Sequence, residues 1–208
     1  PVAKAATIYI DFTNATSGDL APDTSGRYWS QAVSPWNTPS GWTAVENAVD
    51  GANAATTIDL YVVGGFVHPI GAVGDYSLVD WDDVVTDKVW YTDSTGELQL
   101  QDLDTSKTYD LTFYGQVESS KIGASTRGLE VTVGGTAQGG NFGDNSGPLL
   151  FSFTGLSPDA SGNIDIDIPT ANISYSYLSG MTVTEVPEPA TMGLLTVGGL
   201  AALIRRKR

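Results

Sequence analysis

The chain lacks cysteine, and histidine is nearly absent. Among its 208 residues there is no cysteine and a single histidine, His68. The absence of cysteine excludes disulfide frameworks, thiolate metal sites and cysteine nucleophiles. A Ser-His-Asp triad would depend on His68 alone, and that residue precedes Pro69 in a glycine-rich stretch typical of a loop. These absences leave few routes to catalysis.

Other catalytic signatures are missing as well. The sequence has no Gly-x-Ser-x-Gly nucleophile elbow and no lysine-containing phosphate loop. Asp165 and Asp167 would project from one face of a strand about 7 Å apart, a separation that inverting glycosidases use. Both lie on the polar side of an alternating strand without an aromatic neighbour, a pattern typical of solubilising surface acids. We therefore expect a protein that is not an enzyme.

Basic residues are scarce. The formal net charge is −14, and residues 1–185 contain 23 acidic and 6 basic residues, a charge of −17. Such a body is repelled by phosphate backbones, so we expect no nucleic-acid partner.

Long apolar runs are also absent, with one exception at the C-terminus. Residues 190–204 carry no charge, and as a helix they would span roughly 22 Å, short of the ~30 Å hydrocarbon core. Pro187, Glu188 and Pro189 precede this run, and the two prolines favour an extended backbone. Four cations follow the apolar run: Arg205, Arg206, Lys207 and Arg208. If the run forms a short transmembrane helix, these cations predict that its C-terminal end lies on the cytoplasmic side.

Two-residue alternation of apolar and polar side chains dominates the remaining chain and predicts strands. Four segments alternate cleanly, at residues 8–12, 98–101, 129–133 and 164–168. More continuous apolar segments suit central strands, at 58–63, 109–114 and 149–153, and a last strand is expected over 175–183. Turns of the form Asp-x-x-Gly recur, beginning at Asp23, Asp93, Asp144 and Asp159.

Only residues 43–55 resemble a helix former, and Asp50-Gly51 interrupts them. The sequence thus predicts an all-β fold of eight or nine strands, an antiparallel two-sheet β-sandwich of jelly-roll type over residues 7–184. One short C-terminal hydrophobic helix follows it within residues 185–208. Residues 1–6 are either the remnant of signal-peptide cleavage, because Ala3 and Ala5 have the required spacing, or an arbitrary boundary.

The C-terminal segment resembles a known sorting signal. Pro187-Glu188-Pro189, a short glycine-containing apolar run and a terminal basic cluster are similar to the PEP-CTERM signal of exopolysaccharide-producing Gram-negative bacteria. The resemblance implies recognition by an exosortase in the inner membrane, cleavage near residues 187–189, and transfer of the body to the cell surface or extracellular matrix. An ordinary tail anchor would explain the cations but not the two prolines.

The body resembles, more loosely, the extracellular galactose-binding-like β-sandwich domains found ahead of this signal. The similar stretches are "SPWNT" at 34–38, "AVDGANAATTIDLYV" at 48–62, "LDTSKTYDLTFYG" at 103–115, "VTVGG" at 131–135 and "YLSGMTVTEVPEP" at 177–189. Related folds often bind carbohydrate, so the resemblance implies an extracellular polysaccharide as a partner.

Aromatic side chains are the best sequence candidates for such a site. Trp29, Trp36 and Trp42 lie in a segment rich in Ser, Pro and Gly, where a displayed ring could stack on a pyranose. Asn37 could hydrogen-bond a sugar hydroxyl. The alternative is that these rings cap the end of the core beneath a long loop.

Clustered carboxylates offer one candidate metal site. Asp80, Asp82 and Asp83 supply the oxygen ligands that calcium prefers, although the same residues also suit a solvated acidic turn. Two functions from different classes remain: non-catalytic carbohydrate binding at the cell surface, or a structural role in matrix or surface assembly without glycan binding.

Overall fold

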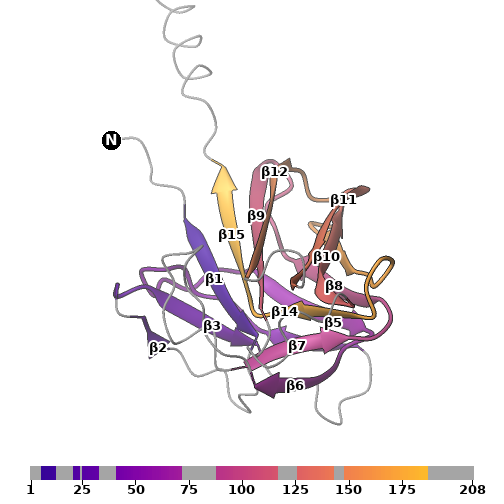
Figure 1. Cartoon of the computed structure of the whole chain (residues 1–208). Coiled ribbons are helices and arrows are strands. Elements are labelled where there is room, and N and C mark those ends of the chain that lie inside the picture. Colours follow the sequence, from indigo (N-terminus) through magenta and orange to yellow (C-terminus); the bar gives the residue numbers. More distant parts are fainter. Residues whose placement is uncertain are drawn as a thin grey trace, which may run out of the picture.

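The computed structural model describes residues 6–12, 21–23, 25–32, 41–71, 88–116, 126–142 and 148–186. The fifteen elements in these ranges are all strands, and they form two sheets (Figure 1). The expectation of an all-β body with two sheets is confirmed.

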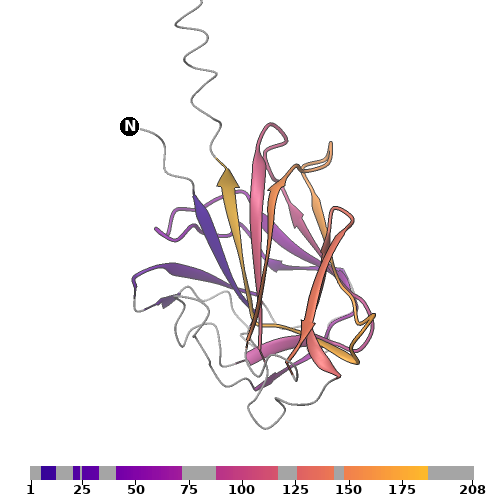
Figure 2. The ribbon, with the colours of Figure 1, turned by 45° about the horizontal axis from the view of Figure 1, so that its top comes forward.

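The smaller sheet has six strands. In spatial order they are β12 (Leu149–Leu156), β9 (Thr108–Gly115), β15 (Gly180–Val186), β1 (Thr7–Phe12), β3 (Tyr28–Ala32) and β2 (Ala21–Pro22). In the turned view of Figure 2 the indigo strand β1 stands beside the yellow strand β15, so the first and last strands of the body are neighbours.

The larger sheet has nine strands. Its main path is β4 (Trp42–Val45), β5 (Asp59–Gly64), β8 (Gly96–Gln101), β13 (Ile164–Ile168), β10 (Arg127–Val133), β14 (Tyr175–Leu178), β7 (Lys88–Thr92) and β6 (Val67–Gly71), and β11 (Thr136–Asn141) pairs with β10.

The alternating segments form strands because one face of each is buried. β13 shows the clearest pattern, with Ile164, Ile166 and Ile168 buried and Asp165 and Asp167 exposed. Large apolar side chains from both sheets, including Phe12, Trp90, Leu111 and Phe113, share one core. Burying such side chains stabilises the fold by roughly 1.5–3 kcal/mol each.

Several details of the predicted fold are wrong. Two strand pairs are parallel, β1 with β3 and β10 with β14, so the sheets are mixed rather than antiparallel. β12 lies at an edge, although its apolar sequence suggested a central strand. The helix-like segment at 43–55 begins as strand β4, because Ala44 and Val45 are buried against the core.

The segment 175–183 is not one strand. It divides at Ser179, so that β14 belongs to the larger sheet and β15 to the smaller one. Jelly-roll connectivity remains a prediction.

Two of the predicted Asp-x-x-Gly turns, those that begin at Asp23 and Asp159, form with a hydrogen bond from the glycine amide to the aspartate carbonyl and a positive φ at the glycine. Asp159 accepts hydrogen bonds at its side chain from the amides of Ser161 (2.8 Å) and Asn163 (2.9 Å). Gly162 donates to the Asp159 carbonyl and has φ +82°, a conformation that glycine tolerates best. At Asp50 the same device occurs with Asn53 (φ 65°) in the fourth position.

Candidate functional site at the end of the last strand

The last described strand is held on both sides almost to its end. β15 pairs with β1 through Thr184 and with β9 through Val186. Beyond the β1 ladder, the amide of Glu185 also donates to the carbonyl of Ala6 at 3.2 Å. The sandwich therefore fixes the chain at the point where the proline-containing tail begins.

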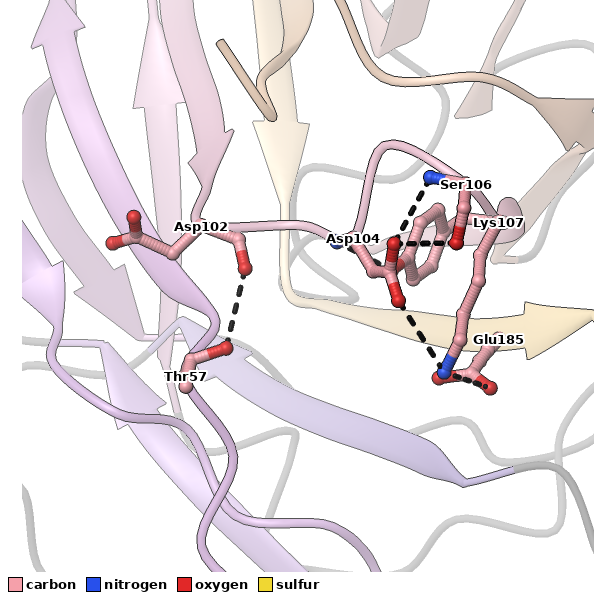
Figure 3. Close-up of polar contacts among 7 residues, drawn as sticks. Thr57, Asp102, Asp104, Ser106, Lys107 and Glu185 are labelled. Carbon is pink, nitrogen blue, oxygen red and sulfur yellow. Dashed lines mark hydrogen bonds and ion pairs between the residues drawn. The ribbon is translucent and has the colours of Figure 1, made fainter.

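A polar cluster surrounds this strand end (Figure 3). The Nζ of Lys107 lies 2.8 Å from Oε1 of Glu185 and 3.8 Å from Oδ2 of Asp104. Asp104 in turn accepts hydrogen bonds from the amide (2.9 Å) and hydroxyl (2.7 Å) of Ser106. Lys107 thus connects the β8–β9 turn to the last strand.

Protonation of the cluster follows these contacts. The hydrogen bond to Glu185 raises the pKa of Lys107, although partial burial opposes the shift. The side-chain and backbone hydrogen bonds from Ser106 lower the pKa of Asp104. Burial raises the pKa of Tyr109, whose hydroxyl accepts a hydrogen bond from the Asp104 amide at 3.0 Å. At neutral pH Lys107 is therefore charged where its Nζ contacts the strand end.

An open cleft of about 290 Å³ adjoins the cluster. Its polar lining includes Thr57, Asp102, Asp104, Lys107 and Glu185. Thr57 donates its hydroxyl proton to the carbonyl of Asp102 at 3.2 Å, which connects the segment before β5 to the segment after β8 (Figure 3). Among the described residues no group of three or more His, Asp or Glu side chains is arranged to hold a metal ion.

A second cleft, of about 330 Å³, lies on the other side of β1. Tyr9, Arg27 and Asp50 line it. Its lining is occupied by internal contacts: the Tyr9 ring lies 5.0 Å from the Trp29 ring and 5.6 Å from the Arg27 guanidinium carbon. Nε of Arg27 donates to Oδ2 of Asp23 at 2.6 Å. The Tyr9 ring therefore contacts neighbours of its own chain while it remains half-buried and lines the cleft.

The structure corrects the predicted role of Trp29. This side chain is fully buried, and its Nε1 donates to Oδ2 of Asp23 at 3.2 Å, so its ring is not displayed for a sugar. Trp42 is half-buried and packs near Trp90, with ring centroids 6.5 Å apart. Both rings follow the core-capping alternative. Trp36 and Asn37 lie outside the described residues.

The remaining predicted sites are also outside the described ranges. They are Asp80, Asp82 and Asp83, the motif Pro187, Glu188 and Pro189, and the cations Arg205, Arg206, Lys207 and Arg208. Within the ranges that the structure describes, no helix has the length and apolarity needed to cross a membrane. Asp165 is exposed and accepts a hydrogen bond from Gln99 at 2.7 Å, as expected of a surface acid.

One group of aromatic residues was missed by the sequence reasoning. Tyr91, Tyr175 and Tyr177 come together with Arg127 where β7, β14 and β10 lie side by side. The alternation of Tyr175 and Tyr177 was visible in the sequence, but their pairing with Tyr91 and Arg127 depends on strand order.

Comparison with known proteins identifies the tail. Residues 185–208 match the PEP-CTERM protein-sorting motif. The match confirms the resemblance seen in the sequence and supports an exported protein that passes through a membrane-anchored sorting step and is processed at its C-terminus. The matched segment begins at Glu185, so its first two residues are also the last two of β15.

The body is similar in fold to extracellular domains of plant receptors. The ANX1 ectodomain from Arabidopsis thaliana is matched with TM-score 0.55, and the ANX2 ectodomain from the same plant with 0.54. Each match has 12% identity and covers 88% of this chain and 42% of the other. The plant receptor-like kinase FER is matched with TM-score 0.52 at the same identity. At this identity the likeness shows the fold alone.

The chain spans less than half of these structures. No curated protein matches its sequence significantly.

Proposed function

We propose that the protein is an exported surface or matrix protein that an exosortase-type membrane protease cuts near residues 187–189. Residues 190–204 anchor it transiently in the inner membrane before the cut, and the acidic sandwich is then released to the cell surface or extracellular matrix. The observation that carries this proposal is the position of the matched sorting motif, which starts within the final two residues of β15.

The position suits processing because the body is complete before the cut. β15 is an interior strand, and its ladder with β9 ends at Val186, immediately before Pro187. Proline has no backbone N–H and would not extend the ladder. A cut after Val186 therefore removes the tail without removing any strand of the sandwich.

Replacing Pro187, Glu188 and Pro189 together by alanine tests the processing step. We expect the variant to fold with an unchanged melting temperature and to accumulate uncut in the inner membrane. Release of the variant at the normal rate would contradict the role of the motif.

We also propose that the body binds an extracellular polysaccharide without catalysis. The sandwich resembles extracellular domains in fold, and its acidity disfavours polyanionic partners. Retention of the full chain in a gel containing the producer's exopolysaccharide tests this function. Loss of retention in Trp36→Ala with unchanged folding would place part of the site at Trp36.

A structural role in assembly is the second candidate. Strand β12 is the terminal strand of its sheet and carries Leu150 with 37% of its surface exposed, and an edge strand is a template for pairing with another chain. Self-association at moderate concentration, without retention by any polysaccharide, would favour this function.

A stabilising calcium ion at Asp80, Asp82 and Asp83 is a separate proposal. An unchanged melting temperature after addition of a chelator would exclude it.

A further inference from the structure

Four side chains from three neighbouring strands share one face of the larger sheet. Tyr177 of β14 is paired with Tyr91 of β7, and Tyr175 of β14 is paired with Arg127 of β10. Paired residues on neighbouring strands point to the same side, and so do residues two apart on one strand. The register therefore gathers three tyrosines and one arginine in a single group, here called the tyrosine platform.

The rings of the tyrosine platform are in mutual contact. Tyr91 stacks on Tyr177 with centroids 5.7 Å apart and an interplanar angle of 26°. The rings of Tyr175 and Tyr91 meet edge to face with centroids 6.0 Å apart. The rings of Phe142 and Tyr177 also meet edge to face with centroids 6.0 Å apart. Tyr177 is buried, whereas Tyr91, Tyr175 and Arg127 are half-buried. The platform is thus rooted in the core and reaches the surface at one end.

Arg127 is held in an unusual way. Its guanidinium carbon lies 5.7 Å from the centre of the Tyr175 ring, and its Nη1 is buried without a hydrogen-bond partner among the described residues. A charged donor left without an acceptor costs free energy, and such groups in native proteins call for an explanation. Acids are abundant in this body, yet Arg127 contacts the Tyr175 ring and has no ion pair among the described residues.

The pair formed by Arg27 and Tyr9 provides an internal contrast. Its geometry is nearly the same, with 5.6 Å between guanidinium carbon and ring centre. Arg27, however, donates to Asp23 through Nε, and Trp29 packs against the Tyr9 ring. The Arg27 pair has a carboxylate acceptor, whereas the Nη1 of Arg127 has no acceptor in the part of the chain that the structure describes.

We propose that the tyrosine platform and Arg127 form a binding site for uncharged saccharides, an inference that rests on the polysaccharide-binding function proposed above. The half-buried rings would pack against the apolar face of a pyranose, and the accessible part of the half-buried Arg127 side chain, not its buried Nη1, would face the sugar hydroxyl groups. An uncharged sugar fits better than a uronate, because residues 1–185 carry a charge of −17 and repel polyanions.

Affinity electrophoresis of the full chain tests the site. The probes are soluble neutral glucan, galactan and mannan, with a polyuronate as the charged comparison. We expect at least one neutral polysaccharide to retain the parent protein. Arg127→Gln and Tyr175→Ala should each weaken that retention roughly tenfold or more, because each removes a contact to the sugar.

Arg27→Gln and Tyr9→Ala are the matched controls and should change retention by less than about twofold. Arg127→Lys should recover part of the lost affinity, since it keeps a donor but not the planar guanidinium. Melting curves identify variants that fail to fold. Tyr91→Phe keeps the aromatic ring and should therefore bind the polysaccharide with near-parental affinity.

Three outcomes would overturn the site. If the parent is retained and both Arg127→Gln and Tyr175→Ala bind normally, the saccharide lies elsewhere while the general function stands. Retention by the polyuronate alone contradicts the uncharged ligand. If no probe and no native exopolysaccharide retains the parent, the polysaccharide-binding function and this site are both wrong.

Discussion

Two arginine–tyrosine pairs of nearly equal geometry differ in what surrounds the cation. Arg27 over Tyr9 is tied to the buried carboxylate of Asp23, which accepts three hydrogen bonds from Arg27 and Trp29. Arg127 over Tyr175 has a buried nitrogen, Nη1, for which the described ranges contain no acceptor. The comparison shows that cation–ring contacts of nearly equal geometry can differ in the acceptors around the cation, so the contact alone does not define a role.

Removing the Asp23 carboxylate should have the largest effect. Asp23→Ala leaves the Nε of Arg27 and the Nε1 of Trp29 without their acceptor. We expect a loss of about 3 kcal/mol in the free energy of unfolding, measured by urea titration at neutral pH. A loss below about 1 kcal/mol would show that the completed pair is not structural.

The pH dependence of the free energy of unfolding also tests the structural role of Asp23. Burial raises the pKa of Asp23, but the hydrogen bonds from Arg27 and Trp29 outweigh it, and the net pKa is lowered. A lowered folded-state pKa contributes stability that is present above the unfolded value of about 3.9 and is lost as pH falls through the folded value. The stability difference between parent and Asp23→Ala should therefore shrink in urea titrations below about pH 4.

Substituting each arginine in turn compares the two pairs directly. Arg27→Gln should destabilise the fold by about 2 kcal/mol, because it leaves a buried carboxylate without its cation. Arg127→Gln should change stability by less than about 1 kcal/mol, since it breaks no ion pair. Equal losses in the two variants would remove the distinction between a structural and an available arginine.

The exposed pair at the end of β15 should give the smallest effect. Lys107 and Glu185 each keep 35% of the side chain exposed, so Lys107→Met should cost at most about 1 kcal/mol at neutral pH. The raised pKa of Lys107 means that this contribution is present below about pH 10.4 and is lost above it. We expect faster hydrogen exchange of the Val186 amide in the variant. Unchanged exchange would contradict a stabilising role for the Lys107–Glu185 pair at the end of β15.

The sequence predicts what depends on local chemistry. Ile164, Ile166 and Ile168 alternate with acids and form a half-buried strand, and Asp159 forms the expected turn. The sorting motif could also be identified, because its prolines, apolar run and cations are contiguous in the chain.

Features that depend on strand order could not be predicted. Local sequence does not show that the parallel pair β10–β14 places Arg127 beside Tyr175. Nor does the composition around Trp29 reveal that Asp23, six residues earlier, would accept its indole proton within the core. A tryptophan in a polar segment suits a surface loop and a buried hydrogen-bonded site equally well.

Export of the sandwich followed by removal of its tail can be tested directly. The measurement is the intact mass of the protein taken from the surface of the native cell. We expect a mature chain that keeps Val186, and with it the whole of β15, ends near residues 187–189 and lacks the apolar segment. A mature surface chain that still carries Arg205, Arg206, Lys207 and Arg208 would contradict it.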